Sequence, residues 1–277
     1  MGYYVLGVHR SGTSVVTRAL ALLVGDQLEP GAVESNPNGQ WERWELRHHL
    51  DRLLLEHGST WDRPPPIDVE WTSPPVGRLV RRGATRGFAG LGSRPWVWKD
   101  PRLCSTLPFW LSLAQAEPRF VVATRHPLDV AVSLVKRDGC PLDVALALWE
   151  RSARALIGGL EGRAVFIVPH ETLLGDPEAT VASLASWVGT DVTGDPIEAA
   201  ASVEARTGPV SQPDPGRLSP EQSVLWDCID HPVGEARLVA KPPPESPSTA
   251  GLLGSASLTQ RLATLARSHV RLRRHRG

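Results

Sequence analysis

The sequence predicts an α/β protein with a doubly wound, mostly parallel sheet that is covered by helices on both faces. Three observations lead to this prediction. Short apolar segments at residues 3–8, 96–98, 120–124 and 164–168 have the pattern of buried parallel strands. Segments with helical apolar spacing alternate with them, as in parallel sheets built from crossover helices. The chain has 277 residues, of which 41% are hydrophobic, enough for one large domain.

The expected helices follow these strands in order. Residues 13–24 carry apolar side chains at helical spacing and are followed by Gly25, a common helix end. Residues 59–75 are rich in proline and tryptophan and predict an irregular surface segment. After residue 190 the pattern weakens. Further helices are expected at residues 41–57, 76–91, 107–116, 128–136, 141–160, 177–188 and 218–229.

The C-terminal part of the chain differs in composition from the rest. Residues 241–248 (KPPPESPS) have the composition of a linker, and residues 258–272 are a candidate for a basic helix. Six arginines and no acidic residue lie between Arg261 and the end of the chain. We therefore expect a main domain over residues 1–240, followed by a proline-rich linker and a basic C-terminal helix over residues 241–277.

The net charge and the cysteines limit the partners and the cellular compartment that we expect for this protein. Lys+Arg and Asp+Glu both number 30, so whole-protein charge gives no reason to expect nucleic acid as a partner. Cys104, Cys140 and Cys228 have neither zinc nor redox spacing and fit a reducing compartment. No apolar run is long enough for a membrane span or a signal peptide. We expect a cytoplasmic protein, and the composition favours a GC-rich bacterial genome.

A phosphate-binding loop is predicted between the first strand and the first helix. In residues 7–14 (GVHRSGTS), Gly7 and Gly12 are spaced as in G-x-x-x-x-G. Thr13 occupies the position at which a nucleoside-triphosphate loop has lysine, which argues against a kinase or NTPase. Backbone N–H groups at a helix N-terminus suit an oxyanion without a polyphosphate tail. They are joined by the side chains of Arg10, Ser11, Thr13 and Ser14.

Together, three segments resemble the motifs of the sulfotransferase family. Residues 10–14 (RSGTS) are similar to the family's 5′-phosphosulfate loop. Residues 124–134 (TRHPLDVAVSL) are similar to its 3′-phosphate motif, with an arginine at a strand end and a serine eight positions later. Residues 99–103 (KDPRL) match the lysine-bearing segment between them. The likeness covers residues 3 to about 190 and is closest to the bacterial branch with Arg-Ser-Gly-Thr and Lys-Asp-Pro-Arg.

The resemblance implies a sulfotransferase domain of P-loop-like topology over residues 1–240. Such an enzyme moves a sulfuryl group from 3′-phosphoadenosine-5′-phosphosulfate (PAPS) to a hydroxyl or an amine, without a metal. PAPS carries anionic groups at both ends of an adenosine, so it needs two anion sites. Arg125 and Ser133 are the candidates for the 3′-phosphate, and Arg10 and Lys99 for stabilising charge on the sulfuryl group. The phosphosulfate candidates are Arg10, Ser11, Gly12, Thr13 and Ser14.

The sequence does not decide which residue is the general base. Many members of the family use a histidine shortly after the central lysine, but none is present in residues 99–102. Residues 37–42 (PNGQWE) are similar to a Gly-x-x-Glu element of the bacterial branch, which makes Glu42 the first candidate. Glu42 could instead stabilise only the beginning of its helix. The other candidates are Glu34, Asp100, His9 and His48.

The sequence also does not identify the acceptor or a binding partner. The acceptor is a small molecule, a glycolipid or a carbohydrate, and the tryptophans of the first hundred residues either pack in the core or line an apolar or sugar-stacking pocket. No His/Cys/Asp cluster has metal-ligand spacing. Neither nucleic acid nor a membrane is expected as a partner, and a homodimer is compatible with the basic tail. A small-molecule P-loop kinase and a non-catalytic nucleotide-binding module are the alternatives.

Overall fold

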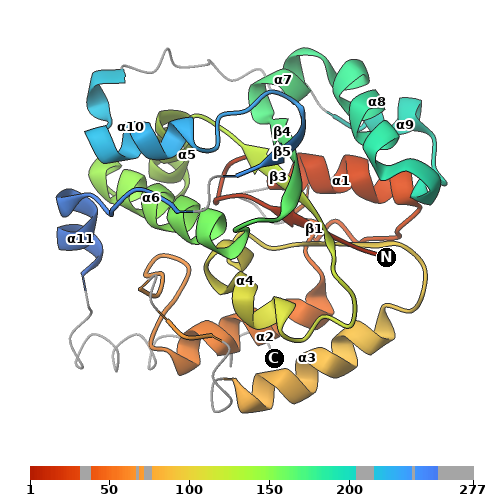
Figure 1. Ribbon diagram of the computed structural model, residues 1–277, viewed down its shortest axis with the longest axis horizontal. Helices are drawn as coiled ribbons and strands as arrows, with labels where there is room; N and C mark the ends of the chain where they lie inside the picture. The colour runs from red at the N-terminus through yellow and green to blue at the C-terminus, as the bar shows by residue number, and fades with distance from the viewer. Residues whose placement is uncertain (32–38, 67–68, 72–76, 204–214, 239–240, 255–277) are drawn as a thin grey trace.

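A single sheet forms the centre of the molecule (Figure 1). The computed structural model describes residues 1–31, 39–66, 69–71, 77–203, 215–238 and 241–254. In these ranges the sheet has five strands in the order β2-β1-β3-β4-β5. The first four are parallel and β5 is antiparallel to β4, which confirms the predicted fold class. The strands are β1 (Gly2–Leu6), β2 (Trp96–Lys99), β3 (Arg119–Thr124), β4 (Ala164–Pro169) and β5 (Gly234–Arg237).

The central strand β1 shows why the apolar segments of the sequence are nearly free of charge. Tyr4 pairs with Trp98 of β2 on one side and with Phe120 of β3 on the other. Successive side chains of β1 enter opposite faces, so that Tyr3 and Tyr4 belong to different hydrophobic clusters. Because both faces are covered, every position of such a strand is selected for burial.

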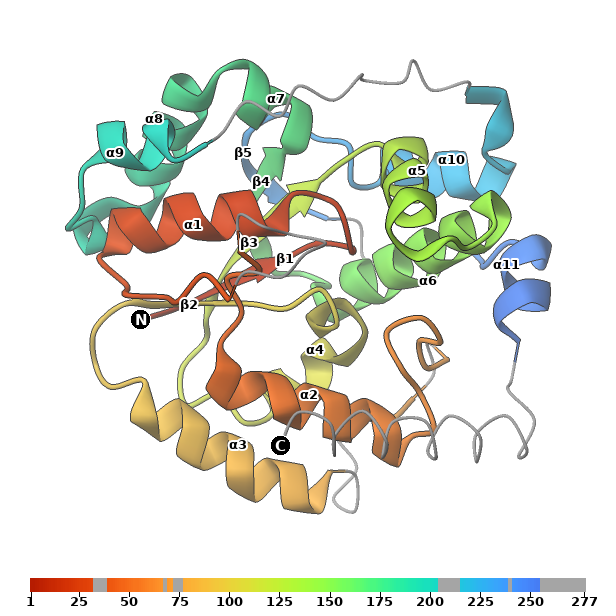
Figure 2. The ribbon, with the colours of Figure 1, turned by 180° about the vertical axis from the view of Figure 1, so that it is seen from behind.

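Three helices cover the face of the sheet that contains Tyr3. They are α1 (Thr13–Val24), α8 (Pro177–Val188) and α9 (Pro196–Ala201), and Figure 2 shows them together on one side of the sheet. Leu20 and Leu23 of α1 are completely buried in this cluster. The helix therefore fixes the loop that precedes it directly against the end of β1.

A second group of helices covers the opposite face. α4 (Leu103–Leu111), α5 (Pro127–Asp138) and α6 (Leu142–Gly159) pack on this side. Beyond α4 lie α2 (Trp44–Glu56) and α3 (Arg78–Gly90), which contact each other (Figure 2). None of the described helices is both long enough and apolar enough to cross a lipid bilayer.

The chain after β4 completes the edge of the sheet and then returns to α6. α7 (His170–Gly175) follows β4 directly, and α10 (Pro220–Asp227) precedes β5. α11 (Pro247–Leu253) packs against α6. The segment with linker composition contacts α6 as well, because Arg151 of α6 pairs with Glu245 at 2.8 Å.

Sequence and structure differ most where the apolar signal is weak. The helix expected at residues 107–116 begins four residues earlier in α4, directly after the turn at residues 100–102. β5 has the polar sequence GEAR and alternates between intermediate and exposed positions, so an edge strand left little hydrophobic pattern to detect. The basic helix expected at residues 258–272 lies outside the described residues.

Candidate functional site

The phosphate-type loop and the Arg125 motif meet at the carboxyl edge of the sheet. β1 and β3 are neighbours, and the chain connects β1 to β2 on its other side, so this is the point where ligands bind in open α/β sheets. Arg125, directly after β3, donates from Nη1 to the Arg10 carbonyl at 3.2 Å. Arg10 donates from Nε to the Ser133 hydroxyl at 2.9 Å. The two motifs, over a hundred residues apart in sequence, form one cluster.

The loop between β1 and α1 has an unusual backbone. Arg10 has φ 70°, a conformation that non-glycine residues adopt rarely and that concentrates at functional sites. Gly12 has φ 90°, and a Cβ there would lie 2.4 Å from the His170 ring. The Ser11 hydroxyl donates to the Val8 carbonyl at 2.8 Å and closes the turn. Within the described structure no side chain caps α1, so its first N–H groups stay available to an anion.

The segment of residues 124–134 positions its side chains through the beginning of α5. The His126 ring accepts a hydrogen bond from the Leu128 N–H at 3.3 Å and so caps α5, with Pro127 in the first helical position. Ser133 then lies on the turn of α5 that reaches Arg10. His126 therefore orients the turn rather than facing a ligand.

Buried polar atoms without a partner mark the end of β3. Within the described residues, the Thr124 hydroxyl and Arg125 Nε are buried and have no hydrogen-bond partner. Glu171 is the acid near Arg125, with 4.0 Å between Oε1 and Nε, too far for a hydrogen bond. Burial raises the pKa of Glu171. An unsatisfied buried donor costs about 1–3 kcal/mol, so these groups fit an anionic ligand that would satisfy them.

Lys99 and Glu42 form a buried ion pair at the same edge. Lys99 ends β2 and is 2% exposed, and its Nζ lies 3.1 Å from Glu42 Oε1. Arg47 Nε lies 3.5 Å from the other carboxylate oxygen. Glu42 precedes Arg43, the N-cap of α2, and follows Trp41, whose φ is 55°. The carboxylate is thus directed toward Lys99 from outside the helix.

Asp100, a candidate for the base, is fully engaged with a neighbouring arginine. It accepts hydrogen bonds from the Arg102 N–H at 2.9 Å and from Arg102 Nε at 2.7 Å, and Arg102 also pairs with Asp51. Burial alone would raise the Asp100 pKa, but the Arg102 charge and hydrogen bonds outweigh it and lower the pKa. The geometry is that of an anion that holds the turn between β2 and α4.

The other base candidates differ in their surroundings. Burial, assisted by the charge of Arg137, lowers the pKa of His9 to about 3, and His9 Nε2 has no partner among the described residues. His48 is exposed, and its ring nitrogen lies 3.4 Å from the Trp44 carbonyl. Glu34 lies outside the described residues. Of these histidines, only His9 belongs to the loop after β1.

His170 was missed by the reasoning from the sequence. It follows β4 directly, is 9% exposed, and packs its ring against Gly12 of the loop. The available signal was its position after an apolar strand, at the edge of the sheet where Arg125 also lies. Among the described residues, no group of three or more His, Cys, Asp or Glu side chains is arranged to hold a metal ion.

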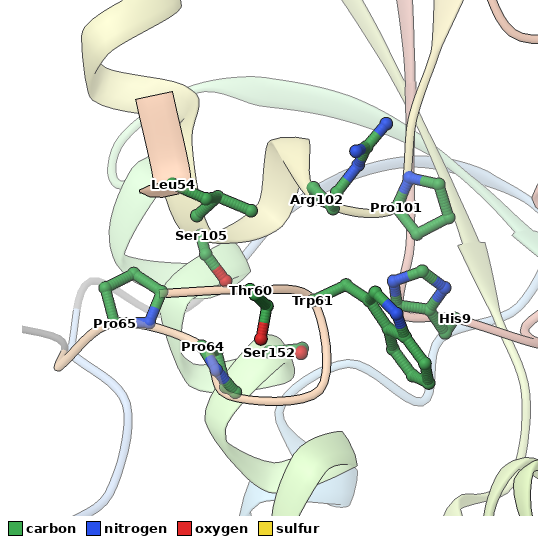
Figure 3. A pocket seen from close by; sticks show the side chains of 10 residues that line it. All are labelled: His9, Leu54, Thr60, Trp61, Pro64, Pro65, Pro101, Arg102, Ser105 and Ser152. Atoms are coloured by element: carbon green, nitrogen blue, oxygen red, sulfur yellow. The ribbon is translucent and has the colours of Figure 1, made fainter. Parts of the chain in front are cut away.

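A small hollow adjoins the loop and the segment after Lys99 (Figure 3). His9 borders it from the loop, and Pro101 and Arg102 border it from the turn after β2. Trp61 lies against His9, with 5.0 Å between the ring centroids. Trp61 therefore lines the hollow, whereas Trp98 is buried in the core.

Comparisons with known proteins were made at three levels. No protein-family model matches the chain, and no curated protein matches it. Two solved structures are similar. The sulfotransferase domain from the Synechococcus PCC 7002 olefin synthase has a TM-score of 0.47 and 19% identity, over 91% of this chain and 93% of that one. The sulfotransferase domain from the curacin biosynthetic pathway has a TM-score of 0.40 and 16% identity, over 90% and 95%.

Proposed function

We propose that this protein is a sulfotransferase that uses PAPS as its sulfuryl donor. One observation carries the proposal: the loop of residues 7–12, the uncapped start of α1 and the unsatisfied Arg125 Nε lie in a single cluster at the switch point of the sheet. A phosphorylated nucleotide with a second anionic group supplies acceptors for both sets of donors.

The binding roles follow from the positions of the donors. The first N–H groups of α1 and the hydroxyls of Ser11, Thr13 and Ser14 would hold the 5′-phosphosulfate. Arg125 and Ser133 would hold the 3′-phosphate, with Arg125 able to offer two parallel N–H groups. Arg10 lies between the two sets, because its side chain contacts Ser133 while its backbone belongs to the loop.

The proposed reaction is a direct in-line transfer. The acceptor oxygen attacks the sulfur atom, an O–S bond forms, and the S–O bond to the 5′-phosphate breaks. Adenosine 3′,5′-bisphosphate leaves with the electron pair of that bond, and the acceptor proton passes to a base. Arg10 and Lys99 would stabilise the charge that develops on the sulfuryl and bridging oxygens.

Glu42 is the proposed general base. Its carboxylate lies at the same edge as Lys99 and is partly exposed, whereas Asp100 is occupied by Arg102 and His48 lies on the exposed side of α2. Lys99 would thus contact both the base and the group in transfer. The low pKa of His9 makes it a weak proton acceptor.

Nucleotide binding tests the proposal directly. By titration calorimetry, adenosine 3′,5′-bisphosphate should bind the intact protein at least tenfold more tightly than AMP. Arg125→Ala should remove most of that difference, whereas Arg237→Ala, an exposed arginine on β5, should leave it unchanged. Equal affinity of the intact protein for the two nucleotides would refute the assignment.

Turnover then separates the enzyme from its alternatives. Sulfuryl transfer from PAPS should persist after exhaustive EDTA treatment, since no metal is part of the proposed chemistry. A phosphoryl transfer that EDTA abolishes and Mg²⁺ restores would favour a kinase. Nucleotide binding without transfer to any acceptor would favour a non-catalytic nucleotide-binding module.

A further inference from the structure

The charges of this chain balance overall, but they are divided between two regions. Lys+Arg and Asp+Glu both number 30 in the full sequence. Residues 71–98 contain five arginines and no acidic residue, whereas residues 170–200 contain six acidic residues and neither lysine nor arginine. The first region includes α3, and the second includes α8 and α9. A protein without net charge therefore has one strongly basic and one strongly acidic region.

Three arginines of α3 form a row on the outer face of that helix. Arg78, Arg82 and Arg86 are spaced four residues apart, so they lie on one side of the helix, about 6 Å apart along its axis. All three are exposed, and within the described structure none has a hydrogen bond or an ion pair. Arg81, in contrast, lies over the Phe109 ring, 4.7 Å from its centre. The arginine row (residues 78, 82 and 86) is therefore an unpartnered helix face.

Four exposed acids of the second region lie on α8 and α9. Glu178 is in the first turn of α8 and Glu198 in the first turn of α9, and the two helices pack against each other. Asp176 and Asp195 are the N-cap residues of these helices. None of the four forms an ion pair with another described residue. We call these four side chains the acidic surface.

Each of the two surfaces also contains one large exposed apolar side chain. Leu79 is 57% exposed and lies beside Arg78 and Arg82 on α3. Ile197 is 78% exposed and precedes Glu198 on α9. A contact that covered both side chains would remove apolar surface from water, and the opposite charges around them would determine which surfaces pair.

The two surfaces lie on opposite faces of the sheet. Val80 of α3 belongs to the cluster that contains Tyr4, whereas Leu184 of α8 and Ala199 of α9 belong to the cluster that contains Tyr3. Figures 1 and 2 show α3 at one end of the molecule and the pair of α8 and α9 at the other. The arginine row therefore cannot reach the acidic surface of its own chain, and both surfaces cannot face the same second copy.

We propose that the arginine row of one copy docks on the acidic surface of a second copy, so that the protein associates head to tail. In such a pair one copy keeps a free arginine row and the other a free acidic surface, so association continues into rings or filaments. The inference does not depend on sulfuryl transfer. A lipid bilayer fits the row less well, because Val80 and Ala84 on the apolar side of α3 are buried in the core.

Sedimentation velocity of the full chain tests the association. At about 20 mM NaCl the average mass should rise with protein concentration and exceed that of a dimer, whereas at 1 M NaCl, where the screening length is about 3 Å, it should stay that of one chain. Arg82→Ala/Arg86→Ala should weaken the association about tenfold. The matched control, Arg217→Ala/Arg237→Ala, removes two exposed arginines outside α3 and should change nothing.

A mixture of two variants tests which surfaces pair. Glu178→Ala/Glu198→Ala should also weaken self-association about tenfold. This variant keeps its arginine row, and Arg82→Ala/Arg86→Ala keeps its acidic surface. The mixture should therefore form one-to-one pairs that add no further copies. Far-UV circular dichroism should be unchanged in each variant, so that lost association reports the surface and not the fold.

The outcomes separate this inference from the proposed function. An intact protein that stays monomeric at low salt, an association that salt does not weaken, or a mixture that forms no pairs would overturn the inference. A monomeric protein that instead binds polyglutamate through the arginine row would show that the row serves another acidic partner. Failure of the intact protein to bind adenosine 3′,5′-bisphosphate would overturn the proposed function alone.

Discussion

Two carboxylates, Glu42 and Glu150, are held in different ways. Glu150 lies in the middle of α6 and is completely buried. Glu42 lies at the carboxyl edge of the sheet, with its side chain 11% exposed, and its partners are the cations Lys99 and Arg47. The hydrogen bonds to Glu150 come from neutral donors, whereas Glu42 pairs with two positively charged side chains.

Both carboxylate oxygens of Glu150 accept hydrogen bonds within the fold. It accepts from the Ser246 N–H at 2.6 Å, the Ser246 hydroxyl at 2.7 Å, the Thr249 hydroxyl at 2.6 Å and Gln222 Nε2 at 3.1 Å. These donors tie α10 and the beginning of α11 to α6 (Figure 1). A buried polar network that is fully satisfied makes the structure rigid and leaves nothing to bind a ligand.

The difference in hydrogen-bond partners distinguishes charged groups that stabilise the fold from groups that are available to a ligand. The four donors that contact Glu150 all reach its carboxylate, although Arg154, one turn further along α6, has buried nitrogen atoms without a partner among the described residues. At the end of β3, Thr124 and Arg125 contain buried polar atoms with no partner, and His9 contains another beside the loop. In native proteins a water, an ion or a ligand commonly satisfies such atoms. The two regions should therefore respond to substitution in opposite ways, one through stability and the other through binding and turnover.

The largest expected effect is at Glu42. Glu42→Gln keeps the size of the side chain and can still accept from Lys99, but it cannot take up a proton at neutral pH. Turnover with PAPS should fall by roughly 10²–10⁴-fold, the usual span for loss of a general base, while bisphosphate affinity changes little. Steady-state kinetics with calorimetry measures both.

Glu45→Gln is the matched control, because Glu45 is exposed in the first turn of α2. It should have near-normal turnover. Near-normal turnover of Glu42→Gln itself would exclude Glu42 as the base and leave Glu34 and Asp100 to be tested. An unfolded Glu42→Gln protein would mean that the carboxylate mainly supports the local fold.

Glu150→Ala should act on stability instead. It leaves the four donor groups around it buried without an acceptor, and the free energy of unfolding should fall by about 3–5 kcal/mol. Urea unfolding measures the loss, and Glu161→Ala, which removes an exposed acid in the turn that follows α6, is the control. An unchanged urea midpoint would show that the contacts contribute no net stability.

Truncation tests the same contacts and the proposed boundary between residues 240 and 241. A chain that ends at residue 254 keeps Ser246 and Thr249 and should unfold at the same urea concentration as the full chain. A chain of residues 1–240 should unfold earlier but still bind adenosine 3′,5′-bisphosphate, since all proposed nucleotide contacts lie before residue 134. Lost bisphosphate affinity in a folded 1–240 chain would contradict this division.

Ser133→Ala should have a smaller effect, confined to binding. The hydroxyl is one of several proposed contacts to the 3′-phosphate, so bisphosphate affinity should fall about three- to tenfold, the value of one hydrogen bond. AMP affinity should not change, because AMP lacks the 3′-phosphate. Ser186→Ala, an exposed serine of α8, is the control for serine removal from a helix. Equal losses for both nucleotides would place Ser133 outside the 3′-phosphate site.

The smallest expected effect concerns His9 and pH. The folded protein keeps His9 neutral down to about pH 3, whereas the unfolded chain takes up a proton near pH 6.5. More protons bind to the unfolded state in this window, so stability rises with pH and is lost as pH falls below 6.5. His9→Gln should remove up to about 1 kcal/mol of the decline between pH 7 and 5.5, by urea unfolding. An identical decline in His9→Gln would contradict the low pKa, and His48→Gln, at an exposed position, should match the intact protein.

By itself the sequence determined the features that depend on nearby residues. The apolar segment at 3–8, the glycine-containing loop and the helix from Thr13 form a continuous unit, so their order alone predicted β1, the loop and α1. Alternation of such units predicted the mostly parallel sheet. The eight-residue spacing of Arg125 and Ser133 placed one at a strand end and the other on the next helix, as observed.

Only the tertiary structure decided which polar groups have hydrogen-bond or ion-pair partners and which do not. The sequence offers both Asp100 and Glu42 as candidates for the base. In the structure, Arg102 donates a hydrogen bond to Asp100, whereas Lys99 pairs with Glu42. The neutrality of His9 and the contact of His170 with Gly12 both require segments that are distant in the chain. Burial, hydrogen bonding and charge act through space, and no local pattern of residues records them.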